Sequence, residues 1–488
     1  MHSPINPISP INPPRQSSAK SAIIDYLKGR NILILGFGRE GKSVFNLLSA
    51  NLPPSDLKNL AIADQTPIKL PDNTPVIPKL ISGPSYLDAC ADYDLIIKSP
   101  GIPSKLLPST IHQKLTSSTD LFLRFCNNPI IGITGTKGKS TTASLLHHIL
   151  TETNYSPQET KNLPKDSHAT PDITASVLAG NIGKPCLDLL DFLDEHPETT
   201  AILELSSHQL EFVHASPHIA VLLNLYEEHL DHYAKKTDYF SAKHNIFRYQ
   251  TAEDFFIYGD ILTHTPTHLL VTCLSQKINF LADQSMPPRS AVKTHLKGEH
   301  NYKNICATLA VCDILKIPRT AALNAISSFH GLPHRLEFIG EYNSVKYYND
   351  SIATIPEATI NALKSIPDTN VLILGGMNRN IDYHPLVDYL VSHPVANLIL
   401  LPDTADLLLD LFKQSSPTQT NFLRADTLAE AVSLAFSVAK PNTSCLLSPA
   451  AASYGFFKNF EERGKVFRQL VQECASLPKN QQTPQNEH

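Results

Sequence analysis

The chain has 488 residues, enough for two to four domains of ordinary size. Hydrophobic residues make up 42% and charged residues 18%, as is typical of a globular protein, and the net charge of −5 provides no basic surplus for binding nucleic acid or an anionic membrane. No apolar run reaches the roughly 20 residues that span a bilayer. The eight cysteines show neither a zinc spacing nor a disulfide framework. We therefore expect a cytoplasmic protein without a membrane span and without a nucleic-acid partner.

The amino-terminal segment is rich in proline, serine and asparagine and contains "SPINP" twice, at 3–7 and 9–13. It has no apolar core long enough for a secretion signal. We predict a disordered tail over 1–20. A second polar stretch, 153–172, is predicted to be a surface loop.

A glycine-rich turn follows the first predicted strand. Residues 30–50 have the pattern strand, turn and helix, and the turn at 36–41 has the spacing G-x-G-x-x-G. A second strand ends at Asp64, and a third ends in the Ser-Pro-Gly turn of 94–103. This fingerprint is typical of folds that receive a diphosphate at a helix N-terminus. Taken alone it suggests a nicotinamide-dependent dehydrogenase, and Asp64 is equally well explained as a simple strand end.

A second glycine-rich turn lies in "GITGTKGKSTT" (132–142), between an apolar strand and a segment with helical spacing. Such a turn aims backbone N–H groups at an anion, Lys139 can reach the outer phosphates of a nucleotide, and a hydroxyl of Ser140 or Thr141 can ligate Mg²⁺. The strict pattern G-x-x-x-x-G-K-[ST] is missed because its first glycine lies one place early. We still interpret the turn as a loop for ATP or GTP rather than a chance helix cap.

Polar residues end the next two apolar strands. Glu204, His229 and Asp231 fall at these carboxyl ends, where open α/β sheets bind ligands. We therefore favour contact with a metal or a substrate over solvated loop ends. From about residue 331 strands and helices alternate again, which predicts a third, mostly parallel sheet.

Residues 237–250 are predicted to form a helix with Thr237 or Asp238 as its N-cap. Lys243 lies three or four positions from four apolar side chains, so it is placed in the middle of the apolar stripe. Two explanations remain open. The stem packs while the ammonium reaches water, or desolvation favours the neutral amine, which can react with CO₂ to give a carbamate, a carboxylate-like metal ligand.

A series of stretches between about residues 30 and 470 resembles, in order, the motifs of the Mur ligases, the ATP-dependent amino-acid ligases of peptidoglycan precursor synthesis. The chain is most similar to the members that add D-glutamate to UDP-N-acetylmuramoyl-L-alanine. The stretches are "GFGREG", "SPGI", "GITGTKGKSTT", "AGNIGKP", "ELSSHQLE", "NLYEEHLDHY", "SAK", "GEHNYKNICA", "GLPHR", "YYNDSIAT" and "LSPAAASYGFFKNFEERG".

The resemblance implies an α/β fold with three domains. These would be a Rossmann-like UDP-binding domain over 21–127, a central P-loop ATPase-like domain over 128–331, and a Rossmann-like amino-acid-binding domain over 332–488. It also implies that the first glycine turn binds the UDP of the substrate rather than NAD. The implied UDP-substrate-binding residues are Gly36, Gly38, Arg39, Glu40, Asp64, Ser99, Gly101, Asn181 and Ser206.

The same resemblance implies the chemistry. ATP phosphorylates the alanyl carboxylate, and the amine of the incoming amino acid attacks the acyl phosphate to give an amide, ADP and phosphate. Lys139, His229 and Lys243 would be catalytic. One Mg²⁺ would lie at Ser140 and Glu204, and a second at His229 and carbamylated Lys243. The implied ATP-binding residues are Gly135, Thr136, Lys137, Gly138, Lys139, Ser140, Thr141, Asn304, Arg335 and Asp350. The resemblance also implies a monomer whose partners are its small-molecule substrates.

The resemblance places the incoming amino acid at His330, Ser453 and Phe460. The chain departs from the family pattern after "NDS", where the best-known members have a lysine that binds glutamate and this chain has Ile352. His330 also stands where threonine is common.

The glutamate charge would then need another partner, and the candidates are His330, Lys458 and Arg463. We expect D-glutamate as the acceptor, with L-glutamate or another amino acid as the alternative. A nucleotide-dependent dehydrogenase and a non-catalytic ATP-binding switch remain competing hypotheses.

Overall fold

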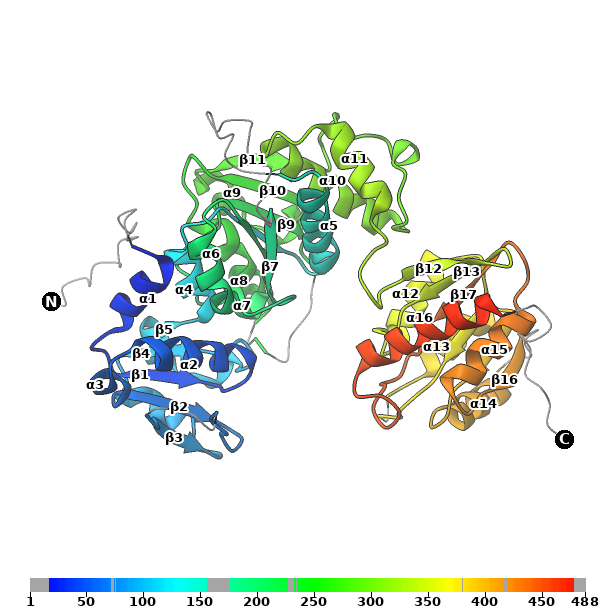
Figure 1. Ribbon diagram of the computed structural model, residues 1–488, viewed down its shortest axis with the longest axis horizontal. Helices are drawn as coiled ribbons and strands as arrows, with labels where there is room; N and C mark the ends of the chain where they lie inside the picture. The colour runs from blue at the N-terminus through cyan, green and yellow to red at the C-terminus, as the bar shows by residue number, and fades with distance from the viewer. Residues whose placement is uncertain are drawn as a thin grey trace, which may run out of the picture. The chain divides into compact units, whose positions relative to one another are not determined.

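The computed structural model describes residues 17–71, 74, 76–155, 175–226, 232–233, 235–379, 381–415 and 420–477. The described chain forms two compact units. The first unit runs to Lys293 and also includes His300–Ile326, and the second consists of Thr294–Glu299 and the chain from Ser327. Two sheets belong to the first unit and one to the second (Figure 1).

The first sheet is parallel, with the strand order β3-β2-β1-β4-β5. Its central strands are apolar and buried, as expected for a sheet covered on both faces. The strands are β1 Ile32–Leu35, β2 Leu60–Asp64, β3 Lys79–Ser82, β4 Leu95–Lys98 and β5 Leu115–Thr116. The helices of this part are α1 Ala19–Leu27, α2 Arg39–Asn51, α3 Pro54–Leu57 and α4 Ser118–Phe125.

The first glycine turn joins β1 to α2 at very close range. A Cβ on Gly41 would lie 2.0 Å from the carbonyl oxygen of Gly36, so only glycine lets the helix begin this near the strand. The Ser99 hydroxyl, at the end of β4, donates to the same Gly36 carbonyl at 2.8 Å. The turn is therefore fixed by its own strand and by the neighbouring strand.

The second sheet is also parallel and has the order β11-β10-β9-β6-β8-β7. Its strands are β6 Ile130–Thr134, β7 Ser176–Gly180, β8 Thr200–Glu204, β9 Ile219–Asn224, β10 Phe255–Asp260 and β11 Gln276–Asn279. Its helices are α5 Lys139–Glu152, α6 Leu190–Glu195, α7 Ser207–Leu210, α8 Lys236–Arg248, α9 Thr267–Thr272, α10 Glu299–Ile314 and α11 Arg319–Ser328.

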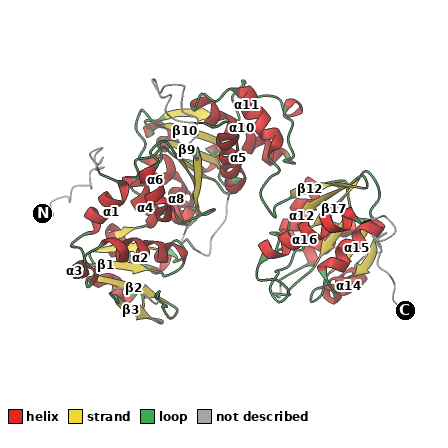
Figure 2. Cartoon of the chain, in the orientation of Figure 1, coloured by secondary structure: helices red, strands yellow, loops and turns green. Residues whose placement is uncertain are grey.

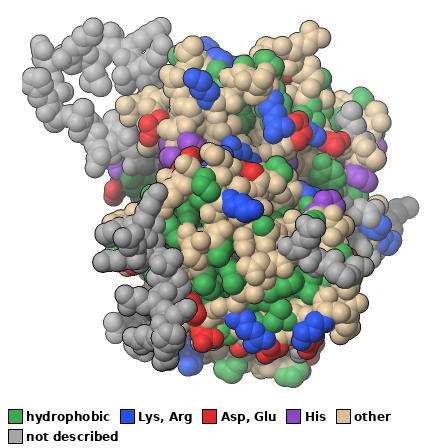
Figure 3. Space-filling model, turned by 90° about the vertical axis from the view of Figure 1, so that its right-hand side faces the viewer, with side chains coloured by type: hydrophobic (Ala, Val, Ile, Leu, Met, Phe, Trp, Pro, Cys, Tyr) green, Lys and Arg blue, Asp and Glu red, His purple; other side chains and the backbone are tan. Residues whose placement is uncertain are grey.

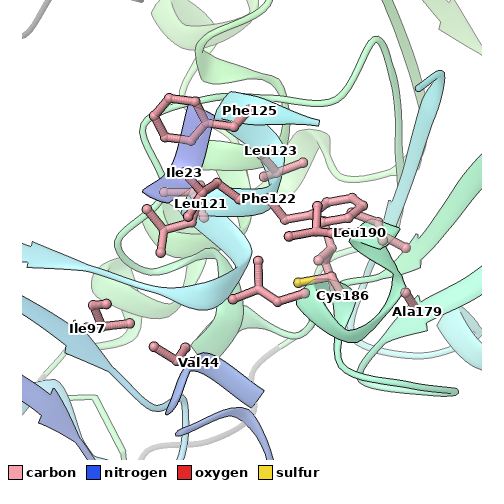
Figure 4. Packing of buried hydrophobic residues seen from close by; sticks show 14 of the residues in the cluster. Ile23, Val44, Ile97, Leu121, Phe122, Leu123, Phe125, Ala179, Cys186 and Leu190 are labelled. Atoms are coloured by element: carbon pink, nitrogen blue, oxygen red, sulfur yellow. The ribbon is translucent and has the colours of Figure 1, made fainter. Parts of the chain in front are cut away.

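One apolar core joins the first and second sheets. Figure 4 shows side chains from both meeting around Phe122 of α4, with Val44 of α2 on one side and Leu190 of α6 on the other. Because these residues are almost fully buried, separating the sheets would expose a large apolar area. The two sheets therefore form one body, and a cavity between them is a stable feature.

Helix α1 strengthens this junction. The backbone N–H groups of Ala19 and Lys20 donate to the carboxylate of Asp194 in α6 at 2.8 and 3.2 Å, a capping arrangement made by a distant residue. The Ser18 hydroxyl accepts from the N–H of Ser21. Residues 18–20, which we assigned to the tail from the sequence, therefore cap and begin a helix instead. Residues 1–16 of that tail and 156–174 of the predicted loop lie outside the described residues.

The third sheet, in the second unit, has the order β12-β13-β17-β14-β15-β16. Among the described strands of this sheet, β12 alone is antiparallel, and it lies at one edge. The strands are β12 Glu337–Tyr342, β13 Val345–Asn349, β14 Thr369–Leu374, β15 Asn397–Leu400, β16 Asn421–Arg424 and β17 Thr443–Leu447. The helices are α12 Pro356–Ser365, α13 His384–Ser392, α14 Ala405–Gln414, α15 Leu428–Val438 and α16 Phe460–Ser476.

Helices cover both faces of this third sheet (Figure 2). Tyr348 and Leu372 face one apolar core, and Tyr347 and Ile373 face another, because successive side chains of a strand point to opposite faces. On the molecular face shown in Figure 3, side chains of both charge signs are interspersed with apolar ones. Within the described ranges, no helix combines the length and the apolar character needed to cross a membrane.

The predicted helix around Lys243 begins earlier than expected. Helix α8 starts at Lys236, so neither Thr237 nor Asp238 is its N-cap. The Asp238 carboxylate instead accepts from the N–H of Lys235 at 3.1 Å. An acidic residue in the first turn that accepts from the N–H of the cap residue is one half of a capping box. Asp238 therefore has this role, and the prediction that it is the N-cap is wrong.

Candidate active site

A cavity of about 790 Å³ opens between the first and second sheets. It lies where β1, β4, β6 and β8 end, the edge at which parallel sheets bind ligands. All the predicted UDP-substrate-binding residues line it, and so do residues of the second glycine loop and of α8. The lining residues that the sequence singled out are Gly36, Gly38, Arg39, Glu40, Asp64, Ser99, Gly101, Asn181, Ser206, Thr136, Lys139 and Lys243.

The second glycine loop is held by the end of β9. The Asn224 amide brackets Lys137, donating to its carbonyl at 3.0 Å and accepting from its N–H at 2.9 Å. The Thr136 hydroxyl lies 3.0 Å from the Tyr239 hydroxyl and accepts from the N–H of Tyr226 at 2.9 Å. The loop is thus fixed in shape while it leads directly into α5, as a preorganised anion site requires.

Two lysines from different helices donate to one carbonyl. The Lys139 ammonium lies 3.0 Å from the Gly135 oxygen, and the Lys243 ammonium lies 2.9 Å from the same oxygen. Lys243 is only 2% exposed and its ammonium also lies over the Tyr239 ring at 5.0 Å. The stem therefore packs in the apolar stripe, but the ammonium faces the cavity and the loop rather than bulk water. Two positive groups at one carbonyl suit a polyanionic ligand.

Asn304 and Gly138 meet at the start of α5. Gly138 has a φ of 91°, and a Cβ there would lie 2.3 Å from the Asn304 side-chain oxygen, so the glycine makes room for the amide. Asn304 is buried and belongs to α10. The Asn304 side chain therefore lies beside the second glycine loop.

Glu204 ends β8 next to the loop strand, since it is paired with Ile133 of β6. It is 1% exposed. One carboxylate oxygen accepts from the Asn181 amide at 2.7 Å, and the other is buried without a hydrogen-bond partner among the described residues. A buried carboxylate oxygen without a partner is costly and fits a metal ligand. Ser140, in the first turn of α5, offers a hydroxyl at the same edge of the sheet.

Two further residues that the sequence suggested as metal or substrate contacts are not among those that the structure describes. His229 lies outside the described residues, as does Asp231. In the part of the chain that the structure describes, no three histidine, cysteine or acidic side chains converge as a metal cluster. Of the expected metal-binding residues, Ser140, Glu204 and Lys243 are therefore described.

Asp64 organises the first glycine loop. Its carboxylate accepts from the N–H of Phe37 at 2.7 Å and from the N–H and hydroxyl of Thr66 at 2.8 Å each. Burial disfavours the charge, but these hydrogen bonds outweigh it and hold the pKa of Asp64 below its ordinary value. Asp64 is therefore more than a strand end, because it fixes the loop that lines the cavity.

Arg39 and Glu40 connect the first loop to the second sheet. The Arg39 guanidinium donates to the Gly183 carbonyl at 2.6 Å. The Glu40 carboxylate accepts from the Gln209 amide at 2.7 Å and from the Ser118 hydroxyl. Both side chains therefore hold the walls of the cavity together, in addition to lining it.

The second unit carries the other predicted residues, near the carboxyl ends of β13 and β17. Asp350 follows β13 and is almost fully buried, and its carboxylate accepts from the Ser448 hydroxyl at 2.8 Å and the Leu336 N–H at 3.1 Å. Burial raises the pKa of Asp350 to about 7, against the lowering effect of these bonds and of the exposed Arg335. Asp350 is thus a carboxyl group that can titrate near neutral pH.

Three residues near this edge were proposed to meet the acceptor charge. Arg463 is 1% exposed and is used internally, since it donates to the Ser351 hydroxyl and carbonyl and to the Ala451 carbonyl at 2.9 to 3.0 Å. His330 is exposed and stacks on His295 with 4.5 Å between ring centroids. Lys458 is exposed in the loop before α16.

The predicted amino-acid contacts lie in the same unit. Ser453 is buried after β17, and Phe460 begins α16, where its carbonyl accepts from the Ser351 hydroxyl at 2.8 Å. Ile352 is half-buried, and its N–H donates to the His334 carbonyl at 3.1 Å. The turn that contains Ile352 is therefore tied both to α16 and to the segment before β12.

Sequence reasoning gave no role to several residues that line the cavity or hold its second loop. Tyr239 and Asn224 fix the second loop, and His208 and Gln209 line the wall. Tyr239 lies four positions before Lys243 on the same helix face, so the spacing offered a signal. Asn224 is a polar residue at the end of an apolar strand, the same signal that drew attention to Glu204. His208 lies within the quoted stretch "ELSSHQLE", but the resemblance gave it no role.

Two family models match the chain. Residues 133–261 match the Mur ligase middle domain, and residues 334–451 match the domain described as "Mur ligase, glutamate ligase domain". Several relatives are named UDP-N-acetylmuramoylalanine–D-glutamate ligase. The protein of Symbiobacterium thermophilum is 33% identical over 421 residues, covering 80% of this chain and 87% of that protein. That of Geotalea uraniireducens is 32% identical over 472 residues, covering 91% and 98%.

Solved structures share the fold at low sequence identity. MurF of Acinetobacter baumannii superposes with a TM-score of 0.53 at 16% identity, covering 90% of each chain. UDP-N-acetylmuramate-alanine ligase MurC of Thermotoga maritima has a TM-score of 0.50 at 16% identity, covering 91% of this chain and 99% of that one. The chain belongs to the Mur ligase family, which confirms the resemblance and the α/β fold class predicted from the sequence.

The buried Asp350 carboxyl group predicts a pH-dependent stability. Its folded-state pKa of about 7 lies above the ordinary 3.8, so the folded state holds the proton more tightly than the unfolded chain. This contribution is complete below the unfolded value and is lost as the pH rises through the folded value. Relative to Asp350→Asn, the wild-type protein should therefore lose thermal stability between about pH 4 and pH 7.

Melting curves of both proteins across this range measure the effect. Asp368→Asn, which changes an exposed aspartate of the same unit, is the matched control and should keep the wild-type slope. Equal slopes for wild type and Asp350→Asn would show that folding does not raise the pKa of Asp350.

Proposed function

We propose that this chain is an ATP- and Mg²⁺-dependent ligase that adds D-glutamate to UDP-N-acetylmuramoyl-L-alanine in cytoplasmic peptidoglycan precursor synthesis. The observation that carries the proposal is the shared cavity, in which the glycine loop of the first sheet and the nucleotide loop of the second face one space. A substrate anion and a nucleotide can meet there. Relatives with about 30% identity over most of the chain carry the corresponding ligase name.

The two glycine loops bind different parts of the substrates. The first loop and the N-terminus of α2 present backbone N–H groups to the diphosphate of the UDP moiety. The second loop and the N-terminus of α5 receive the phosphates of ATP. With the UDP end at one sheet, the alanyl carboxylate extends toward the other, where the γ-phosphate lies. Holding the reactants in this order supplies much of the rate advantage.

Lys139 acts on the phosphates. Its ammonium donates to the Gly135 and Thr136 carbonyls at 3.0 and 3.1 Å, so it is already held at the loop. A carboxylate oxygen of the substrate attacks the γ-phosphorus, and ADP leaves as the phosphorus–oxygen bond to it breaks. The charge that develops on the transferring group and on ADP is stabilised by the lysine. The product is an acyl phosphate.

The amide bond then forms from this activated carbonyl. The amine of glutamate attacks the carbonyl carbon, its proton passes to a base, and the tetrahedral intermediate expels phosphate. Water must be kept out, since it would hydrolyse the acyl phosphate. The acceptor is bound by the second unit, where Ser453, Phe460 and His330 are the proposed contacts and Arg335 and Asp350 the proposed nucleotide contacts.

The metal-binding residues fit Mg²⁺ at one site. Ser140 and the unpartnered oxygen of Glu204 would hold it, and the bound ion supplies charge neutralisation between the nucleotide and the substrate carboxylate. We propose a second site at His229 and Lys243. Carbamylation of Lys243 would replace two like charges at the Gly135 carbonyl by an opposite pair, because Lys139 donates to the same oxygen. We further propose that the enzyme acts as a monomer.

A nucleotide-dependent dehydrogenase would need only the first loop. The second loop with Lys139, Lys243 and the buried Glu204 has no use in such an enzyme, and it supports the ligase. The test is ADP release by the purified protein with UDP-N-acetylmuramoyl-L-alanine, Mg²⁺ and a panel of D- and L-amino acids. We expect release that depends on D-glutamate. A preference for L-glutamate or a neutral amino acid would mean that Ile352 marks a different acceptor, and reduction of a nicotinamide cofactor without ADP release would favour the dehydrogenase.

Replacing Lys139 tests the nucleotide loop. Lys139→Ala removes the charge from the outer phosphates and should lower turnover by at least about 10²-fold. The matched control is Lys58→Ala, at an exposed lysine of the same unit that does not line the cavity, and it should keep near wild-type turnover. Steady-state ADP release measures both. Near-normal ligation by Lys139→Ala would contradict the assignment of the loop.

Replacing Lys243 tests the carbamate. Lys243→Ala should be nearly inactive, and short carboxylic acids such as acetate should restore part of the turnover by occupying the vacated site. Lys236→Ala, at the exposed start of the same helix, serves as the control and should not respond to acetate. Substantial activity of Lys243→Ala without any added acid would argue against a carbamate.

A further inference from the structure

The position of the Glu204 carboxylate depends on one amide. Of its two oxygens, Oε1 accepts from the Asn181 Nδ2 group at 2.7 Å, and Oε2 is buried without a described hydrogen-bond partner. This carboxylate is 1% exposed. Asn181 is therefore the group that fixes which way the free oxygen points.

Asn181 is itself fixed by hydrogen bonds to the end of β8. Its backbone N–H donates to the Glu204 carbonyl at 2.9 Å, so main chain and side chain both contact the same residue. The N–H of Gly180 donates to the Lys184 carbonyl at 3.0 Å and closes the 180–184 loop. With the loop closed and attached to the end of β8, the amide has little freedom to leave the carboxylate.

The same loop is contacted from the first sheet. Arg39, in the first turn of α2, donates through Nη2 to the Gly183 carbonyl at 2.6 Å and to the Gly180 carbonyl at 3.4 Å. Arg39 and Asn181 both line the cavity. A continuous set of contacts thus runs from the UDP-binding loop through the 180–184 loop to the carboxylate beside the nucleotide loop.

We propose that Asn181 is a positioning residue for the metal-ligating carboxylate of Glu204, and that Arg39 positions the loop that carries it. The proposal rests on the Mg²⁺ site proposed above. An amide suits the task because it orients the carboxylate without changing its charge. A cationic partner would compete with the metal, and an acidic partner would repel the carboxylate. Groups that orient a metal ligand in this way are typically worth 10- to 100-fold in metal affinity.

Arg39 extends the effect to the substrate. Its guanidinium now donates to neutral carbonyls, and a diphosphate bound at the neighbouring glycine loop is a stronger acceptor for the same N–H groups. Binding of the UDP moiety would therefore weaken the hydrogen bonds from Arg39 to the 180–184 loop. Because Asn181 belongs to this loop, the geometry of the metal site would change as well. Coupling between two sites is reciprocal, so bound metal and nucleotide would change the affinity for the UDP substrate by the same factor.

The test measures metal binding without turnover. The non-hydrolysable ATP analogue AMPPNP is titrated calorimetrically into the full chain with saturating Mn²⁺ and again with EDTA, and the ratio of the two dissociation constants gives the metal-dependent gain in affinity. Asn181→Ala should reduce this gain by about tenfold or more, with the affinity in EDTA unchanged. Arg39→Met should reduce it in the same direction but less. Lys184→Ala, an exposed change in the same loop, should retain the wild-type gain.

The outcomes separate this proposal from the proposed function. If Glu204→Gln retains the full gain, the metal site itself is wrongly placed. If Glu204→Gln loses the gain but Asn181→Ala retains it and binds only the UDP substrate more weakly, Asn181 is a substrate contact and the positioning role is refuted. Asn181→Ser, which keeps a shorter donor, should recover part of the gain if the hydrogen bond is what matters. Melting curves of each variant show whether the fold is intact.

Discussion

The carbonyl oxygen of Gly135 is the point on which the chemistry of this protein depends. Lys139 from the helix after the loop and Lys243 from a helix far along the chain both donate to it. One strand away, the Glu204 carboxylate is buried with one oxygen lacking a described partner. Two ammonium groups and a buried carboxylate thus lie at the same edge of one sheet. Phosphates together with a divalent cation satisfy both.

The loop can keep this arrangement only because its surroundings are rigid. Asn224 brackets the loop from β9, and the Tyr239 hydroxyl contacts Thr136 from α8. The apolar core around Phe122 then joins this sheet to the first one, so that the substrate loop faces the nucleotide loop across a fixed space. Preorganised charge needs no rearrangement during the reaction, and this is where such sites gain most of their effect.

Much of the fold was predictable because each strand that carries the site is a short apolar run ending in a turn. The strands β1, β2, β4, β6, β8 and β9 were located in this way. The antiparallel β12 was not anticipated, because pairing direction is a property of tertiary structure. The start of α1 was missed although its N-cap, Ser18, is local, and the second group that satisfies its first N–H groups, Asp194, lies far away in the sequence.

The site was predictable to the extent that its residues lie in contiguous motifs. Lys139, Glu204 and Asp64 were singled out by their motifs, and Lys243 by its place in an apolar stripe. What the motifs could not give is how the residues contact one another. The bond between Asn181 and Glu204 and the contact of Arg39 with the 180–184 loop join segments that are distant in sequence. Such contacts depend on packing, and periodicity carries no information about them.

We propose that this cavity transfers a phosphoryl group from ATP to a carboxylate and then releases phosphate as the amide forms. The most direct measurement uses UDP-N-acetylmuramoyl-L-alanine labelled with ¹⁸O in the alanyl carboxylate, with ATP and D-glutamate. Phosphate released by the enzyme is analysed for ¹⁸O by mass spectrometry or ³¹P NMR. Each phosphate should carry one oxygen from the carboxylate, because the bond between that oxygen and carbon breaks when the amide forms. Phosphate without label, formed at the same rate as the amide product, would contradict it.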